Sequence, residues 1–183
     1  MSIKQATRLV AAAACAALLV TSCDSTTNSQ PDTAATRTPT NRTTSPSPSE
    51  GSSARQALAA YRAMWTDVQV LSATANYTDP RLGEHLAGQA YTTISENMSV
   101  EKAHGIIALG APVLHPSIVT ATSTRVTMRD CLDDSHWLTY YAATHKLSDT
   151  APGGHRYVAA TVTDENGAWK VTVLDTRGEG TCT

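Results

Sequence analysis

The stretch RYVAATVTDENGAWKVTVLDT, residues 156–176, decides the fold of this chain. Two runs rich in β-branched and aromatic residues, 156–164 and 168–176, flank the tripeptide Glu165-Asn166-Gly167. Asn-Gly tolerates the positive φ angles of a type I′ turn, which joins antiparallel strands. The alternation puts three apolar residues of the second run on one face: Trp169, Val171 and Val173. The stretch therefore predicts a β-hairpin.

The pattern continues upstream of this hairpin. Residues 137–146 (WLTYYAATHK) predict another strand, and residues 117–131 (SIVTATSTRVTMRDC) predict one long strand with a bulge, because β-branched residues dominate but alternate imperfectly. Before them, residues 106–116 are apolar but are broken by Gly110, Pro112 and Pro116. We expect a short strand or an irregular sheet edge there.

Two helices are predicted before the strands. Residues 54–73 carry an apolar stripe at helical spacing, which consists of Leu58, Tyr61, Met64, Trp65, Val68 and Leu71. Ser52 or Ser53 is expected to cap the start of this helix. A second helix is expected over residues 80–98, with Asp79 as N-cap and Pro80 in the first turn. Helices followed by hairpin-linked strands predict an α+β fold, with N-terminal helices packed on a curved antiparallel sheet of about four strands.

The N-terminus has the order of an export signal. Lys4 and Arg8 precede the uncharged run 9–20, which at 12 residues is too short to span a bilayer. Thr21-Ser22-Cys23 follows and resembles a bacterial lipobox, in which the cysteine becomes the lipidated mature N-terminus. We therefore expect a protein held at the cell membrane by acyl chains on Cys23, such as palmitate, on the extracytoplasmic face.

Three regions are expected along the chain: a signal peptide over 1–22, a lipidated cysteine with a disordered linker over 23–53, and a folded domain over 54–183. The linker is rich in Ser, Thr and Pro and has almost no large apolar residue, so it buries too little surface to offset the entropy of ordering. Once Lys4 and Arg8 are removed, 12 basic residues face 16 acidic ones, a net charge of −4. That balance argues against nucleic-acid binding.

The cysteines predict one disulfide. Cys15 leaves with the signal and Cys23 carries lipid, which leaves Cys131 and Cys182 as a pair in an oxidising compartment. Closing a loop of this length stabilises the fold by roughly 4 kcal/mol in the chain-entropy model.

Several of these features together give a family resemblance. Asp79-Pro80-Arg81-Leu82 at a helix start, the closing strand Asn166-Gly167-Ala168-Trp169-Lys170-Val171 and the C-terminal Cys182 resemble small actinobacterial lipoproteins of the nuclear transport factor 2-like (SnoaL-like) superfamily, most of them uncharacterised. The resemblance implies a curved sheet wrapped around a helix with an open cavity. The residues expected to line that cavity are aromatic: Tyr61, Trp65, Tyr91, Tyr141 and Trp169.

No catalytic constellation can be identified from the sequence. Ketosteroid-isomerase-like members of the superfamily use an Asp base with a Tyr, and the residues of these types are Asp79, Asp130, Tyr61, Tyr77, Tyr140 and Tyr141. Their spacing singles none out. The histidines are scattered without metal-binding spacing, and Asp130, Asp133 and Asp134 lack that of a calcium loop. We expect no cofactor and no metal.

The sequence thus predicts a lipid-anchored, non-catalytic extracytoplasmic domain that binds a small apolar ligand or an envelope protein partner. A cone-fold enzyme working in the cavity and a structural subunit of an envelope complex are the alternatives. A deep cavity with a desolvated Asp or Tyr at its base would favour the enzyme. An interior filled by Met64, Trp65 and Met128 would favour an interaction surface.

Overall fold

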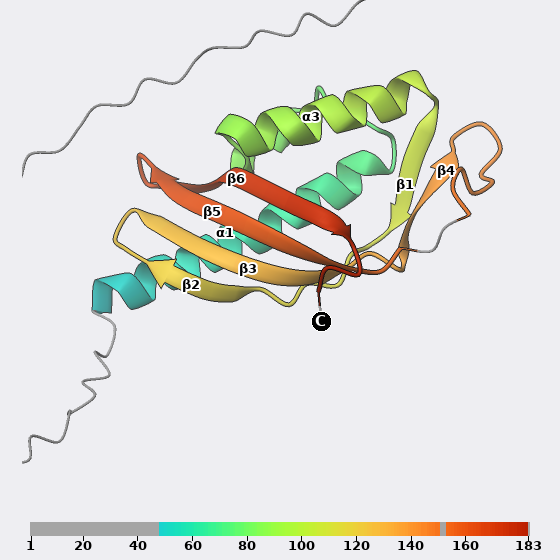
Figure 1. Ribbon diagram of the computed structural model, residues 1–183. Coiled ribbons are helices and arrows are strands. Elements are labelled where there is room, and N and C mark those ends of the chain that lie inside the picture. Colours follow the sequence, from blue (N-terminus) through green and yellow to red (C-terminus); the bar gives the residue numbers. More distant parts are fainter. Residues whose placement is uncertain (1–47, 151–152, 183) are drawn as a thin grey trace, which may run out of the picture. The chain divides into compact units, whose positions relative to one another are not determined.

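The computed structural model describes residues 48–150 and 153–182 (Figure 1). The signal, Cys23 and most of the expected linker lie outside the described residues. The described helices are α1 (Pro48–Ser72), α2 (Leu82–His85) and α3 (Gly88–Ala103). The described strands are β1 (Ile106–Gly110), β2 (Ser117–Ala121), β3 (Arg125–Asp133), β4 (Trp137–Tyr141), β5 (His155–Glu165) and β6 (Ala168–Glu179). No described helix combines the length and the hydropathy needed to cross a membrane.

The strands form two antiparallel sheets. Four strands pair in the order β2-β3-β5-β6, and β1 pairs with β4 in a separate two-stranded sheet. Helix α1 runs along one face of the four-stranded sheet, α3 lies beside β6, and the β1–β4 pair stands where α3 ends (Figure 1). The α+β class and the sheet of about four strands are therefore confirmed.

The hairpin that the sequence predicted is present, but its last strand carries a bulge. Asn166 and Gly167 have φ angles of 59° and 90°, and Glu165 pairs with Ala168. Further along, Val171 pairs with Val162 and Val173 pairs with Thr161, so Thr172 is an extra residue in β6. The expected common face for Val171 and Val173 is therefore wrong. Val171 is buried, Val173 is 45 % exposed, and Leu174 takes the inward position instead.

The single long strand expected over residues 117–131 is wrong. The chain turns after Ala121 and returns as β3. The Thr122 hydroxyl donates to the Arg125 carbonyl oxygen and accepts from the Arg125 N–H, at 2.9 and 3.0 Å. This side-chain turn replaces the Gly or Asn that usually marks a hairpin.

The single helix expected over residues 80–98 is also wrong. The Asp79 carboxylate accepts the Arg81 N–H at 3.0 Å and starts the turn that leads into α2, but this helix stops at His85. Leu86 and Ala87 then run extended beside β6, where the Ala87 N–H donates to the Val171 carbonyl oxygen at 3.0 Å. A new helix, α3, begins at Gly88, whose φ angle is +53°.

Helix α1 and strand β4 also differ in their bounds from the expected ones. Helix α1 begins at Pro48, before the expected start at residue 54, so the part of the linker from residue 48 onward is helical. Ser52 and Ser53 consequently lie inside the helix and do not cap it. The buried Ser53 hydroxyl donates to the Ser123 carbonyl oxygen at 3.2 Å and ties α1 to the β2–β3 turn. Strand β4 ends at Tyr141, because a turn with His145 at φ +52° follows.

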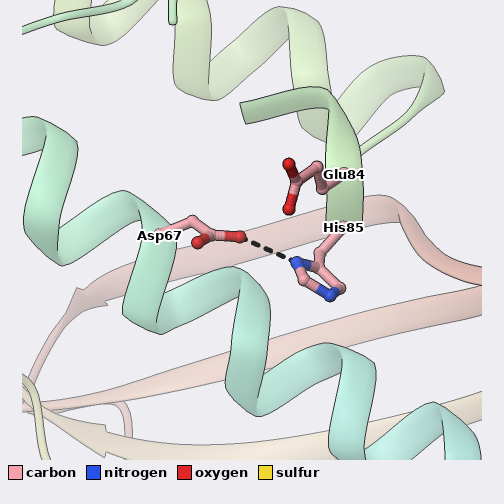
Figure 2. A group of neighbouring side chains, drawn as sticks. All are labelled: Asp67, Glu84 and His85. Carbon is pink, nitrogen blue, oxygen red and sulfur yellow. Dashed lines mark hydrogen bonds and ion pairs between the residues drawn. The ribbon is translucent and has the colours of Figure 1, made fainter. Parts of the chain in front are cut away.

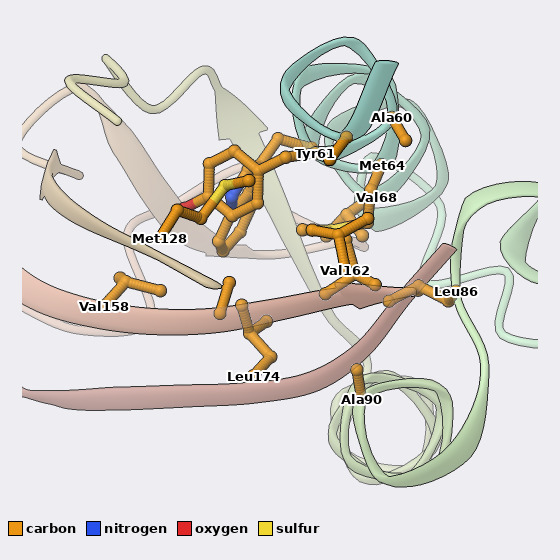
Figure 3. Packing of buried hydrophobic residues seen from close by; sticks show 14 of the residues in the cluster. Ala60, Tyr61, Met64, Val68, Leu86, Ala90, Met128, Val158, Val162 and Leu174 are labelled. Carbon is orange, nitrogen blue, oxygen red and sulfur yellow. The ribbon is translucent and has the colours of Figure 1, made fainter. Parts of the chain in front are cut away.

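The space between α1 and the four-stranded sheet is filled by side chains (Figure 3). The stripe expected on α1 is buried almost throughout, and it packs against inward residues of β3, β5 and β6: Val126, Met128, Leu132, Val158, Ala160, Val162, Val171 and Leu174. Met64 is fully buried and Met128 is 2 % exposed. The cavity that the resemblance implies between the helix and the sheet is therefore filled by side chains in the described part of the chain.

Candidate functional site

A cavity of about 280 Å³ opens between the C-terminal halves of α1 and α3 and the β1–β4 pair. The chain brings five elements together there, since β6 contributes Thr176 at one side. The other lining residues are Trp65, Val68, Ser72, Ile94, Asn97, Met98, Glu101, Ala108, Asp134, Trp137 and Thr139. We call this cavity the tryptophan pocket.

Two tryptophans form one wall of the tryptophan pocket. Trp65 reaches it from α1 and Trp137 from the first position of β4, and their rings meet edge to face with centroids 5.9 Å apart. Both indole Nε1 atoms are buried, and neither finds a hydrogen-bond acceptor among the described residues. An unpaired buried donor costs about 1–3 kcal/mol. Both indole N–H groups lie beneath the surface, so the tryptophans offer the pocket the apolar parts of their side chains.

Glu101 brings a carboxyl group to the same pocket from α3. It is partly buried, and burial raises its pKa above the ordinary value. Its carboxyl group has no hydrogen-bond or ion-pair partner within the described part of the chain. The neighbouring Lys102 instead donates to the Thr74 carbonyl oxygen at 3.0 Å. Glu101 therefore presents an uncompensated carboxyl group to whatever enters.

Asp134 is the second acidic residue of the pocket, and its carboxylate already has hydrogen-bond partners. Its carboxylate accepts from the Gly154 N–H at 2.6 Å and from Arg156 Nε at 2.5 Å. Among the described residues that line the pocket, none is Lys, Arg or His. The local charge balance of the lining is therefore negative, with Glu101 as its unpaired member.

The five aromatic residues expected to line one cavity do not come together. Tyr61 and Trp65 touch edge to face, with ring centroids 6.4 Å apart, but Tyr61 is fully buried in the core. Tyr91 and Tyr141 are 39 % and 47 % exposed, and Trp169 packs against the core from its edge. Of the five, Trp65 alone lines the tryptophan pocket.

Asp130 and Tyr61 form a buried pair. The Tyr61 hydroxyl donates to Asp130 Oδ2 at 2.9 Å, and the His115 N–H donates to Asp130 Oδ1 at 2.6 Å. Burial raises the pKa of both side chains; for Asp130, the hydrogen bonds from His115 and Tyr61 oppose this rise. Asp130 also borders an open cavity of about 310 Å³ beside the disulfide. Through these hydrogen bonds Asp130 ties β3 to α1 and to the segment before β2.

The disulfide expected between Cys131 and Cys182 is present. It joins β3 to the segment after β6, and the Thr181 hydroxyl accepts the Tyr157 N–H from β5 at 3.1 Å. The C-terminus is thereby held across the end of the sheet.

Asp67, Glu84 and His85 form a second polar cluster between α1 and α2 (Figure 2). Asp67 Oδ2 and His85 Nδ1 lie 2.7 Å apart, and one ligand atom from each of the three residues falls within 4.8 Å of the others. Imidazole and carboxylate are ligand types that zinc accepts, so these residues could hold a metal. The direct Asp67–His85 contact accounts for most of the arrangement without one.

Sequence reasoning did not identify Trp137 or Glu101 as pocket residues. Trp137 follows a polar turn at a strand start, which gives no sign of what its ring faces. Glu101 occupies a helix whose polar and apolar residues are poorly segregated, and its burial depends on β1 and β4 packing beside it. Helical spacing did identify Trp65 as an inward residue.

No protein-family model and no curated protein matches the chain. Among solved structures, the intermembrane-space region of the chloroplast protein ARC6 is similar at 16 % identity and a TM-score of 0.44, covering 69 % of this chain and 97 % of that one. A proposed scytalone dehydratase from Novosphingobium aromaticivorans is similar at 15 % identity, TM-score 0.43, covering 68 % and 87 %. A cystatin-like protein of unknown function from Nostoc punctiforme gives 9 % identity, TM-score 0.43, and 70 % and 92 % coverage.

Proposed function

We propose that this protein is a lipid-anchored extracytoplasmic domain that binds a small ligand in the tryptophan pocket and does no chemistry on it. The observation that supports the proposal is the pocket itself, in which Trp65 and Trp137 line the same cavity as the partly buried, unpaired carboxyl group of Glu101. Rings for apolar contact together with a few unsatisfied polar groups are the usual composition of a small-ligand site.

The volume limits the size of the ligand. At about 280 Å³, the tryptophan pocket lies just below the range of about 300–1,000 Å³ for drug-sized ligands. A compact molecule with an apolar body fits these dimensions. The interior between α1 and the sheet offers no comparable space, because Met64 and Met128 fill it.

The location of the domain is the second half of the proposal. The export signal and the lipobox-like Thr21-Ser22-Cys23 support a mature chain that begins at lipidated Cys23. The Cys131–Cys182 disulfide is compatible with an oxidising compartment outside the cytoplasm. Mass spectrometry of the protein purified from its host should find acyl chains on Cys23, and an unmodified N-terminus at another residue would contradict the anchor.

Ligand binding can be tested with a matched pair of exposed α3 positions. Asn97 lines the tryptophan pocket and Thr92 does not, so Asn97→Phe should cover the pocket while Thr92→Phe leaves it open. A panel of compact organic compounds is screened against the full-length protein by thermal shift. We expect compounds that raise the melting temperature of the wild type and of Thr92→Phe but not of Asn97→Phe. If no compound distinguishes the two variants, the proposed site is wrong.

A further inference from the structure

We infer that the tryptophan pocket selects an organic cation, a compact ammonium compound with an apolar body, through the Glu101 carboxylate and the rings of Trp65 and Trp137. This inference rests on the proposed function and adds to it the chemical class of the ligand.

The charges around the pocket give the first step. Glu101 is partly buried and has no partner in the described part of the chain, while Asp134 is neutralised by Arg156 at 2.5 Å. A carboxylate that is partly removed from water without a counter-charge raises the energy of the empty pocket. An entering cation removes that cost, whereas an entering anion adds to it.

The second step is the absence of a competing cation in the described lining. The adjacent Lys102 donates to the Thr74 carbonyl oxygen, and Arg156 is held by Asp134. Neither side chain lines the tryptophan pocket. The positive charge that Glu101 lacks must therefore come from the ligand, or Glu101 must bind a proton.

The aromatic wall gives the third step. An ammonium group near the face of a Trp ring gains about 0.5–1 kcal/mol at exposed sites and about 2 kcal/mol when desolvated. Trp65 and Trp137 are the only aromatic residues in the described lining, and their rings stand at 90° to each other. Trp65 is 5 % exposed and Trp137 is less buried, so Trp137 offers most of the ring surface that a cation can approach.

These three observations favour one chemical class of ligand over the others. A neutral apolar compound would leave Glu101 uncompensated, and a carboxylate or phosphate would meet repulsion from it. A bare metal ion would make no use of the two indole rings. Of these ligand classes, only an organic cation would interact favourably with both the tryptophan rings and the Glu101 carboxylate.

The test compares choline with its neutral carbon isostere, 3,3-dimethylbutan-1-ol, by isothermal titration calorimetry on the full-length protein. The two probes have the same shape and hydroxyl and differ in the charge. We expect choline to bind about tenfold more tightly, a difference of 1.4 kcal/mol. Glu101→Gln should remove most of that preference and leave the part that the tryptophan rings supply, while Glu96→Gln, an exposed α3 position outside the pocket, should keep all of it.

The outcomes separate the inference from the proposed function. If both probes bind equally, and Asn97→Phe abolishes both, the pocket binds ligands but does not select cations, and the inference fails alone. If the wild type and Glu101→Gln prefer choline equally, a group other than Glu101 recognises its positive charge, and the inference also fails. If neither probe binds, the inference fails, and the thermal-shift screen decides the proposed function separately.

Discussion

At the scale of single residues, Asp130 is the most heavily used polar side chain of the core. It is 2 % exposed and accepts hydrogen bonds from the Tyr61 hydroxyl and the His115 N–H. Asp130→Ala leaves both donors unpaired, and we expect it to lower the free energy of unfolding by about 2–4 kcal/mol in urea denaturation. Asp130→Asn keeps an acceptor for His115 and should cost about 1 kcal/mol. Equal losses in the two variants would contradict this role.

Glu101 should show the opposite behaviour, because burial raises its pKa and no described group compensates its charge. The folded state then holds the Glu101 proton more tightly than the unfolded chain does. Its favourable contribution is present below the ordinary pKa of 4.5 and is lost as the pH rises through the raised value. Glu101→Gln should therefore stabilise the empty protein at pH 7, by less than about 1 kcal/mol, and have no advantage at pH 4.

The measurement for Glu101 is thermal denaturation of the wild type and Glu101→Gln between pH 4 and pH 7. Glu96→Gln serves as the control, since Glu96 is exposed on the same helix. A loss of stability in Glu101→Gln at pH 7 would show that the carboxylate has a stabilising partner and would remove a premise of cation selection.

The residue types in the sequence identified only some of the residues that form the site. The helical spacing of α1 predicted that Tyr61 and Trp65 point inward, and both do. It could not separate Tyr61, which bonds to Asp130 in the core, from Trp65, which reaches the pocket, because that difference depends on which strand lies opposite. Tyr91 follows the core residue Ala90 on α3, so one position of helical rotation moves it into solvent.

At the scale of elements, the pocket depends on how closely β1 approaches the start of β4. Gly110 pairs with Trp137, has a φ angle of +99°, and leaves no room for a Cβ beside the His136 carbonyl oxygen. Gly110→Ala should force the two strands apart, lower the unfolding free energy by about 3 kcal/mol and deform the pocket wall.

Gly105 is the matched control for Gly110. Its φ angle is +65°, but a Cβ there would meet no atom within 4 Å. Gly105→Ala should therefore cost only the backbone strain, about 1 kcal/mol. Urea denaturation and amide exchange of β1 and β4 measure both effects, and similar losses in the two variants would contradict the close approach at Gly110.

The disulfide acts on the arrangement of β3, β5 and β6. Cys131 and Cys182 are 51 positions apart, so Cys182→Ala combined with Cys131→Ala frees a long loop in the unfolded chain. We expect a loss of about 4 kcal/mol in urea denaturation. Reducing agent should destabilise the wild type and leave the double variant unchanged. A double variant as stable as the wild type would contradict a structural role for the bond.

The elements that the sequence failed to predict have two different causes. The Asn166-Gly167 turn was readable because its residues favour positive φ angles. The β2–β3 turn was not, because a Thr122 hydroxyl makes it, and threonine is also a common strand residue. The break between α2 and α3 follows from pairing with Val171, which is far away in the sequence.

At the scale of the whole molecule, we propose different roles for two parts of the chain. In the proposal, the N-terminal signal and Cys23 determine where the domain works, and the tryptophan pocket determines what it binds. A sensor or carrier of small cations held at the outer face of a membrane would need these two properties and no catalytic group. Export and anchoring stay predictions from the sequence, whereas the pocket could be described only once α1, α3, β1 and β4 were placed together.

The most direct test uses the three tryptophans of the chain as probes. The indole N–H groups of ¹⁵N-labelled protein are assigned through Trp→Phe variants and followed by NMR as choline is added. We predict that the Trp65 and Trp137 signals shift together, that the Trp169 signal stays, and that Glu101→Gln raises the choline concentration needed for the shifts by up to about tenfold. Unmoved Trp65 and Trp137 signals, or a shift centred on Trp169, would contradict this prediction.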